Sequence, residues 1–283
     1  MNSGDTDNNA RSAADAPASV WAELLRCARD IAATERTLAP LLLEYVLQRH
    51  SLADAIATRL GAKLVYHSER GGHLREVFME AFDADPQISI AIAADLRAVV
   101  ARDPACDTVL TPFLWFKGFQ AITCHRVAHW LWGQNRREFA RYLQSLVSEV
   151  FAVDIHPAAV FGRGIMLDHA TSFVVGETAI VDDDVSFLHD VTLGGTGKDR
   201  GDRHPKVRRR VLVGAGAKIL GNIEIGEGAQ VGAGSVVLDS VPPHCTVTGV
   251  PAKVVGEVKS QNPARDMDHY ISHPDSFILG AGI

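Results

Sequence analysis

The chain is poor in cysteine, and its cysteines are far apart. Its 283 residues include four of them, at positions 27, 106, 124 and 245. Proteins held together by disulfide bonds have closely spaced cysteines in a short chain, so a disulfide framework is disfavoured here. The scattered cysteines instead predict reduced thiols and a cytoplasmic protein.

The chain also lacks a long apolar run and a surplus of positive charge. The most apolar stretch, residues 113–132, is interrupted by basic and imidazole side chains: Lys117, His125, Arg126 and His129. No segment has the pattern of a membrane span or a signal peptide. Lys and Arg total 28 against 34 Asp and Glu, a formal net charge of −6. This balance disfavours nucleic-acid binding, so we expect neither nucleic acid nor membrane as a partner.

The C-terminal half carries apolar residues at a spacing of six. An early run is shifted in phase by two residues from a second run, and a third run has the same spacing of six. The positions are Ile155, Phe161, Leu167 and Phe173; Val175, Val181, Phe187 and Leu193; and Val213, Ile219, Ile225, Val231 and Val237. A spacing of six fits neither a strand, with period two, nor a helix, with period 3.6. It is typical of the hexapeptide repeat of a parallel β-helix.

Each hexapeptide of such a fold points one large aliphatic side chain inward and turns sharply beside it. Gly often follows the apolar residue, as in Val175-Gly176 and Val231-Gly232, and Gly adopts the backbone angles of tight turns at little cost. One repeat cannot bury its own apolar face, so stability comes from neighbouring coils. The polar and charged segment 196–212 interrupts the period and is expected to loop out as an arm.

The predicted fold class is α+β, with an N-terminal α-helical domain followed by a left-handed parallel β-helix with an extended arm loop. We expect a disordered N-terminus over 1–19, the helical domain over 20–150, the β-helix with the catalytic groups over 151–256, and a flexible tail over 257–283. Within the helical domain, Asp85-Pro86 and Thr111-Pro112 are each expected to begin a helix, with Asp or Thr as the cap and Pro as the first helical residue.

The candidate chemistry lies in the β-helix. Asp154 precedes the first repeat, Asp168 and His169 lie in a turn, and Arg203 and His204 lie in the arm. A neutral His can accept a proton near neutral pH, and a carboxylate on its other nitrogen fixes the tautomer. We therefore predict His169 as a general base oriented by Asp154. The alternative from the residues alone is a surface His beside a solvated Asp.

Several segments closely resemble the serine O-acetyltransferase family, and the resemblance extends over nearly the whole chain from about residue 20. In the C-terminal half they are residues 154–159 (DIHPAA), 162–171 (GRGIMLDHAT), 175–179 (VGETA), 191–198 (VTLGGTGK), 201–206 (GDRHPK), 214–222 (GAGAKILGN) and 249–252 (GVPA). In the N-terminal half they are residues 102–105 (RDPA), 117–119 (KGF) and 129–132 (HWLW).

This resemblance implies transfer of acetyl from acetyl-CoA to the L-serine hydroxyl, giving O-acetyl-L-serine for cysteine biosynthesis. It assigns His169 as the general base with Asp154 as its partner, Asp103 and Asp168 near the serine ammonium, and Arg203 and His204 at the serine carboxylate. These roles are complementary in charge, because an amino acid needs anions for its amine and cations for its carboxylate. No permanently bound cofactor or metal is implied.

The resemblance also implies how the chain assembles and what it binds. Acetyl-CoA is expected in the groove between adjacent β-helices of a trimer, lined by Gly195, Thr196, Ala215 and Ala233. Lys206 and Arg208–Arg210 would attract the CoA phosphates or form a solvated charged loop. Two trimers joined through the helical domains would form a hexamer. The terminal Ile283 resembles a docking peptide for O-acetylserine sulfhydrylase, and L-cysteine is a possible feedback inhibitor.

Other interpretations stay open at this point. A covalent route would use Cys245 beside His244 or Cys124 beside His125, although adjacent side chains diverge in both strands and helices. A metalloenzyme of the γ-carbonic-anhydrase type would need three convergent histidines. The chain could be a regulatory scaffold for a sulfhydrylase, or an acetyltransferase for another acceptor such as homoserine or a sugar.

Overall fold

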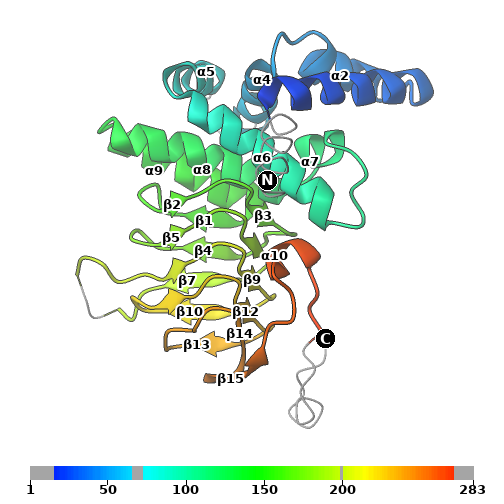
Figure 1. Ribbon diagram of the computed structural model, residues 1–283. Coiled ribbons are helices and arrows are strands. Elements are labelled where there is room, and N and C mark those ends of the chain that lie inside the picture. The colour runs from blue at the N-terminus through cyan, green and yellow to red at the C-terminus, as the bar shows by residue number, and fades with distance from the viewer. Residues whose placement is uncertain (1–15, 66–72, 198–199, 271–283) are drawn as a thin grey trace, which may run out of the picture.

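The computed structural model describes residues 16–65, 73–197 and 200–270. Helices form one end of the molecule, and a column of stacked short strands extends from it (Figure 1). The predicted fold class, a helical region followed by a parallel β-helix, is confirmed. None of the helices within these ranges is long and apolar enough to cross a membrane.

The helical region begins earlier than predicted. Pro17 is the first residue of the first helix, so residues 17–19 are helical rather than disordered; residues 1–15 lie outside the described residues. Its elements are α2 (Pro17–Thr34), α3 (Ala39–Leu42), the π-helix η1 (Leu43–Leu47), α4 (Leu52–Val65), α5 (Leu74–Ala84), α6 (Pro86–Arg102), α7 (Leu110–Leu114), α8 (Lys117–Gly133) and α9 (Arg137–Phe151).

The two predicted helix starts have different outcomes. Asp85 caps α6 as predicted, because its carboxylate accepts a hydrogen bond from the Gln87 N–H at 3.0 Å. Thr111 does not cap α7, which begins at Leu110 without a side-chain cap. The Thr111 hydroxyl instead lies 3.4 Å from that of Thr108, so this helix starts one residue before the predicted cap.

The β-helix has three sheets of mainly parallel strands, and most coils contribute one short strand to each sheet. Sheet A contains β1 (Val153–Ile155), β4 (Phe173–Val175), β7 (Thr192–Gly194), β10 (Lys218–Leu220) and β13 (Val236–Val237). Sheet B contains β2 (Val160–Phe161), β5 (Ile180–Val181), β8 (Lys206–Val207) and β11 (Glu224–Ile225). Sheet C contains β3 (Met166–Leu167), β6 (Ser186–Phe187), β9 (Leu212–Val213), β12 (Gln230–Val231), β14 (Cys245–Gly249) and the antiparallel β15 (Ala252–Glu257).

The turns between the sheets form three corners that run down the column. The first corner joins sheet A to sheet B and includes residues 156–159, 176–179 and 195–205. The second joins B to C and includes residues 162–165 and 182–185. The third joins C to A and includes residues 168–172, 188–191, 214–217 and 232–235. Residues at equivalent places in successive coils are therefore stacked along one corner.

The arm is shorter than predicted. Lys206 and Val207 form β8, which pairs with β5 and β11, and the Val207 side chain is fully buried. Val207 lies six residues before Val213, so it continues the hexapeptide period into the segment assigned to the arm. The chain loops out only over 195–205, at the first corner between β7 and β8 (Figure 1), and residues 198–199 lie outside the described residues.

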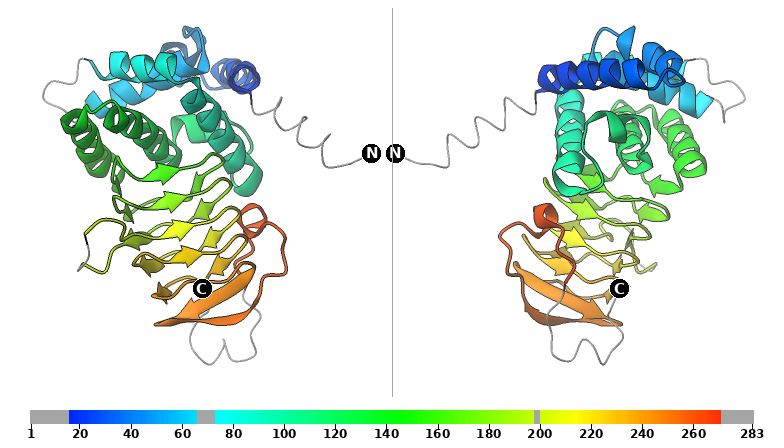
Figure 2. Two further views of the ribbon diagram at one scale, coloured as in Figure 1. Left: turned by 60° about the vertical axis from the view of Figure 1, so that its left-hand side comes forward. Right: turned by 90° about the vertical axis from the view of Figure 1, so that its right-hand side faces the viewer.

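The predicted flexible tail contains an ordered part. Residues 258–270, which we call the C-terminal strap, run back along the β-helix and include α10 (Pro263–Asp266) (Figure 2). Ala264 is fully buried, and its carbonyl accepts a hydrogen bond from the Ser186 hydroxyl at 2.7 Å. The Asp268 carbonyl accepts from the Gln230 amide at 2.7 Å. Burial and these bonds fix the strap, and only 271–283 lie outside the described residues.

Buried charges join the helical region to the first coils. Arg126 of α8 forms an ion pair with Asp95 of α6, with Nη2 and Oδ2 2.7 Å apart, and Nη2 also donates to the Gly162 carbonyl at 2.7 Å. The other carboxylate oxygen of Asp95 accepts from the Ile165 N–H at 2.8 Å. Both side chains are buried, so the second corner is hydrogen-bonded directly to α6 and α8.

Candidate active site

His169 lies in the third-corner turn between β3 and β4. Its backbone φ is +55°, and that of Ala170 is also +55°. Two consecutive residues in the left-handed region make a sharp turn, and the turn leaves the His169 side chain 76% exposed. The Asp168 carboxylate lies 3.9 Å from Nε2 of His169. The predicted base is therefore accessible to a substrate, and an acid lies beside it.

The N-terminus of α8 supports this turn. Lys117 donates a hydrogen bond to the Thr171 hydroxyl. At Gly118, a Cβ atom would lie 1.9 Å from the Leu167 carbonyl oxygen. Only glycine allows this close approach of the helix to β3, so the Lys117-Gly118 pair places α8 directly against the chain that leads into the turn.

Asp154 lies on the outer face of sheet A. Its neighbours Val153 and Ile155 are buried, so the strand alternation turns Asp154 outward. Its Oδ1 accepts a hydrogen bond from the Gln144 amide of α9 at 2.7 Å. In the part of the chain that the structure describes, Asp154 and His169 form no hydrogen bond with each other, so the dyad stays a prediction.

Asp103 follows the last residue of α6. Its Oδ1 accepts from the Ala105 N–H at 2.8 Å, which fixes the loop that leaves the helix. Cys106 in the same loop packs with Met166 of β3. The Asp103 loop therefore lies beside the strand that leads into Asp168 and His169.

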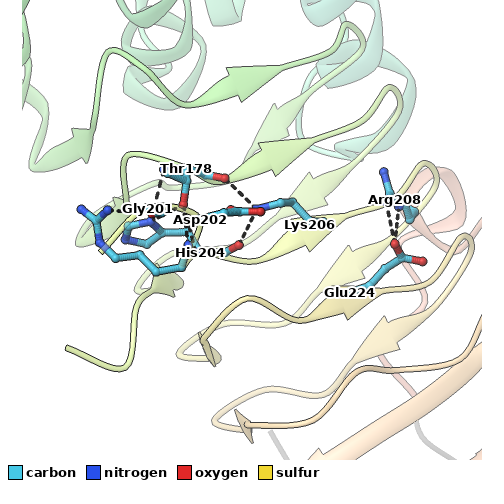
Figure 3. A network of polar contacts seen from close by, with 8 residues as sticks. Thr178, Gly201, Asp202, His204, Lys206, Arg208 and Glu224 are labelled. Atoms are coloured by element: carbon cyan, nitrogen blue, oxygen red, sulfur yellow. Dashed lines mark hydrogen bonds and ion pairs between the residues drawn. The ribbon is translucent and has the colours of Figure 1, made fainter. Parts of the chain in front are cut away.

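Arg203 and His204 lie at a different corner, on the returning limb of the arm. Figure 3 shows His204 beside Thr178. The Thr178 hydroxyl accepts hydrogen bonds from the backbone N–H groups of Arg203 at 3.0 Å and His204 at 3.1 Å. Arg203 Nη2 donates to the Glu177 carboxylate at 2.9 Å. The His204 ring lies over Gly176, where a Cβ atom would come within 1.9 Å of Nε2. The arm is therefore fixed by the residues of the coil before it.

The electrostatics of this corner follow from these contacts. The hydrogen bond from Arg203 lowers the pKa of Glu177 below its usual value. Burial, followed by the positive charges of Arg203 and Lys206, lowers the pKa of His204. The Thr178 N–H donates to Nδ1 of His204 at 3.2 Å, so that nitrogen is an acceptor and Nε2 carries the proton. His204 is thus a neutral hydrogen-bond donor at neutral pH.

Most of the basic residues proposed for the CoA phosphates are paired within the chain. Lys206 lies 2.5 Å from the Asp202 carboxylate, Arg208 forms an ion pair with Glu224 at 2.5 Å, and Arg210 lies 3.5 Å from Glu227. Figure 3 shows the first two of these pairs. A bound phosphate would have to compete with these carboxylates.

The four residues predicted to line the acetyl-CoA groove are also divided between corners. Gly195 and Thr196 begin the arm at the first corner. Ala215 and Ala233 are stacked at the third corner, where the Gly234 N–H donates to the Ala215 carbonyl at 2.7 Å. Asp190 and Gly195 flank sheet A in one coil, and five residues of strand span about 16 Å. The predicted site residues of a single chain therefore lie mainly in two groups, one at each edge of sheet A, which we call the two half-sites.

Three side chains at these half-sites were not predicted. The His189 ring lies 6.0 Å from that of His169 at an angle of 79°. The signal was its place one coil after His169, at the same corner. Glu177 and Thr178, which fix the arm, lie one coil before His204 at the first corner, and the coil period places them there.

The structure provides evidence on two alternative functions, the covalent cysteine route and the metalloenzyme. Burial raises the pKa of the Cys124 thiol, which keeps this fully buried sulfur protonated and makes it a poor nucleophile. Within the described ranges, no group of three or more His, Cys, Asp or Glu side chains is arranged to hold a metal ion. His156 and His204 lie at the first corner, and His169 and His189 lie at the third.

Comparison with known proteins agrees with the resemblance over the length of the chain. Residues 20–124 match the family model described as serine acetyltransferase, N-terminal, and residues 204–239 match that of the bacterial transferase hexapeptide (six repeats). The serine acetyltransferase of Escherichia coli K12 is 52% identical over 265 residues, which cover 93% of this chain and 97% of that protein.

Two solved structures with ligands are similar throughout. A serine acetyltransferase in complex with cysteine has a TM-score of 0.88 and 48% identity, covering 90% of this chain and 100% of the other. The serine acetyltransferase of Brucella abortus S19 in complex with coenzyme A has a TM-score of 0.83 and 48% identity, covering 86% of this chain and 97% of the other.

Proposed function

The chain belongs to the serine acetyltransferase family, and we propose that it transfers the acetyl group of acetyl-CoA to the hydroxyl of L-serine. The products are O-acetyl-L-serine, used for cysteine biosynthesis, and free CoA. The observation that carries this proposal is the exposed His169 beside Asp168, in a turn that the Lys117-Gly118 pair supports. The relative that binds coenzyme A supports acetyl-CoA as the co-substrate.

The reaction proceeds by direct attack. His169 takes the proton of the serine hydroxyl as its oxygen forms a bond to the acetyl carbon, because a hydroxyl is a weak nucleophile until a base removes its proton. The tetrahedral intermediate collapses with breakage of the carbon–sulfur bond, and the proton on His169 passes to the CoA sulfur. Asp154 orients the imidazole in this proposal; one of its carboxylate oxygens accepts from Gln144, and the other is available for the ring.

The substrate-binding groups come from both half-sites. Asp103 and Asp168 bind the serine ammonium near the third corner, and Arg203 with neutral His204 binds its carboxylate from the first corner. Since sheet A separates these corners in one chain, a second copy supplies the missing half. The two halves meet in a trimer, with acetyl-CoA between adjacent β-helices against Gly195, Thr196, Ala215 and Ala233. The helical domains join two trimers into a hexamer.

Regulation and partners follow the family. We propose L-cysteine as a feedback inhibitor at the serine site, in line with the relative that binds cysteine. Ile283, the proposed contact with O-acetylserine sulfhydrylase, lies outside the described residues. The proposed location is cytoplasmic.

The experiment is an assay of CoA release with L-serine, with homoserine, and without an acceptor. Serine-dependent release should fall by about 10²–10⁴-fold in His169→Ala, the contribution of a general base. His50→Ala, which removes an exposed ring of the helical region, is the control and should keep full activity. Release that prefers homoserine would overturn the acceptor, and an active His169→Ala would overturn the base.

A further inference from the structure

Gln144 is the residue of the helical region that reaches the carboxylate of Asp154. It lies on α9, which packs against β1, the first strand of the β-helix (Figure 1). Its amide donates a hydrogen bond to Oδ1 of Asp154 at 2.7 Å. Among the described residues, no other side chain or backbone N–H is hydrogen-bonded to this carboxylate. The orientation of the carboxylate therefore depends on a single residue outside the β-helix.

The chemistry of the pair determines which atoms meet. An ionised carboxylate can only accept hydrogen bonds, so the amide nitrogen of Gln144, and not its oxygen, faces Asp154. The bond occupies one lone pair of Oδ1 and leaves Oδ2 open. Because the amide is uncharged, it orients the carboxylate without neutralising it, whereas a Lys or Arg side chain would form an ion pair there. The negative charge of Asp154 stays available to stabilise an imidazolium ring.

The other groups near Asp154 leave its charge in place. The register of sheet A pairs Asp154 with Val174 of β4, which is uncharged. His156, two residues further along the chain, is neutral at neutral pH because burial lowers its pKa. Arg141 of α9 forms an ion pair with Glu138. A neutral donor is therefore the polar contact that the structure gives to this carboxylate.

The hydrogen bond from Gln144 is not what attaches α9 to the β-helix. The helix ends at Phe151, and Ala152, with a φ of +55°, turns the chain into β1. The attachment is apolar, because one face of α9 is buried in the core: Ala140, Leu143, Leu146, Val147 and Phe151. The half-buried Gln144 lies beside this face. Substitution of Gln144 should therefore leave the fold intact.

We propose that Gln144 is a positioning residue for acetyl transfer, a role that rests on the proposed function, in which Asp154 orients the base. Gln144 holds the Asp154 carboxylate in the orientation that the ring of His169 requires. Without this bond, the Asp154 side chain can turn to other rotamers, and the imidazole loses a fixed acceptor on the nitrogen opposite the serine hydroxyl. In this proposal Gln144 contacts neither serine nor acetyl-CoA, so it affects the chemical step and not binding.

The test compares variants of the full chain in serine-dependent CoA release. Gln144→Met keeps the length of the side chain and removes the donor. It should lower kcat by about 10- to 100-fold, the loss of one hydrogen bond to a charged group, while the KM for serine stays within about twofold. Gln134→Met makes the same exchange at an exposed glutamine and should keep normal kcat. An unchanged kcat in Gln144→Met would overturn the proposal.

A double variant separates positioning from a structural role. Asp154→Asn removes the charge that Gln144 orients. If Gln144 acts only through Asp154, adding Gln144→Met to Asp154→Asn should lower kcat further by no more than about twofold. Losses that multiply would show that Gln144 acts through the fold and would contradict the proposal. Full activity of Asp154→Asn would refute the role of Asp154 in the proposed function and, with it, that of Gln144. A large loss in Asp154→Asn beside a normal Gln144→Met would refute the role of Gln144 alone.

Discussion

At the residue scale, the position of His204 depends on a glycine beneath its ring. A methyl group at Gly176 would lie 1.9 Å from Nε2 of His204, and the ring is packed too closely to move without disturbing the arm. Gly176→Ala should therefore displace His204 and raise the KM for serine about tenfold, the loss of one hydrogen bond to a charged group. Initial-rate kinetics at varied serine concentration measure this.

The control for this change is Gly133→Ala at the end of α8, where a Cβ would meet nothing within 4 Å. Its serine KM should equal that of the unmodified chain. An unchanged KM in Gly176→Ala would mean that the ring of His204 takes no part in holding the serine carboxylate.

At the element scale, β8 decides where the arm ends. Val207 is fully buried between β5 and β11, although the segment around it is strongly basic. Val207→Ala should lower the free energy of unfolding by about 2 kcal/mol, the cost of removing two buried methyl groups and leaving a cavity. Val174→Ala, on an outward position of β4 that is 39% exposed, should cost about 0.5 kcal/mol. Urea unfolding of the two variants compares the two losses in free energy of unfolding. Equal losses would mean that Val207 is not a buried residue of the β-helix and belongs to the arm.

The strand β8 also shows which parts of the fold could be predicted from the sequence. The six-residue period predicted the β-helix, because one large inward side chain per hexapeptide leaves a periodic pattern. The period also extends to Val207. This extension was missed because the charged residues Lys206 and Arg208–Arg210 on either side of Val207 made the segment resemble a polar loop. Asn262 caps α10 and Pro263 follows it, which is a helix-start pattern in the predicted tail. These boundaries could have been predicted from local rules.

The site was less predictable because it depends on contacts between distant segments. Nothing near Asp154 in the sequence indicates that Gln144 of another element holds its carboxylate. The pairing of Arg203 with Glu177 arises only because successive coils stack these positions at one corner. The chemistry of the residue types predicted their roles, and the coil period indicated which positions share a corner. The division of these residues into two half-sites could be recognised only from the fold.

At the scale of the whole molecule, buried histidines make stability depend on pH. The pKa values of His125, His156 and His204 are all lowered, in each case mainly by burial. The unfolded chain therefore binds more protons than the folded chain below the ordinary histidine value of about 6.5. The stability is fully present above that pH and is lost as the pH falls through the lower, folded values.

The urea midpoint of unfolding should therefore be lower at pH 5.5 than at pH 7.5. His204→Gln removes one titrating ring and should reduce the difference in the free energy of unfolding between the two pH values, by up to about 1.4 kcal/mol per pH unit within the window. His73→Ala, at an exposed ring, is the control and should retain the full difference. Equal midpoints at both pH values would contradict the assignment of neutral buried rings.

The separation of the two half-sites leads to a prediction about the assembly. If each active site combines the third corner of one copy with the arm of another, a defect in either half inactivates a site wherever it occurs. Co-expressed His169→Ala and Arg203→Gln chains would form some sites in which both halves are intact. With random mixing at equal amounts, roughly a quarter of the sites should carry no substitution. The mixture should therefore recover about that fraction of normal activity, although each variant alone is nearly inactive. The measurement is serine-dependent CoA release from the purified co-expressed chains, and a mixture as inactive as its components would assign both halves to one chain.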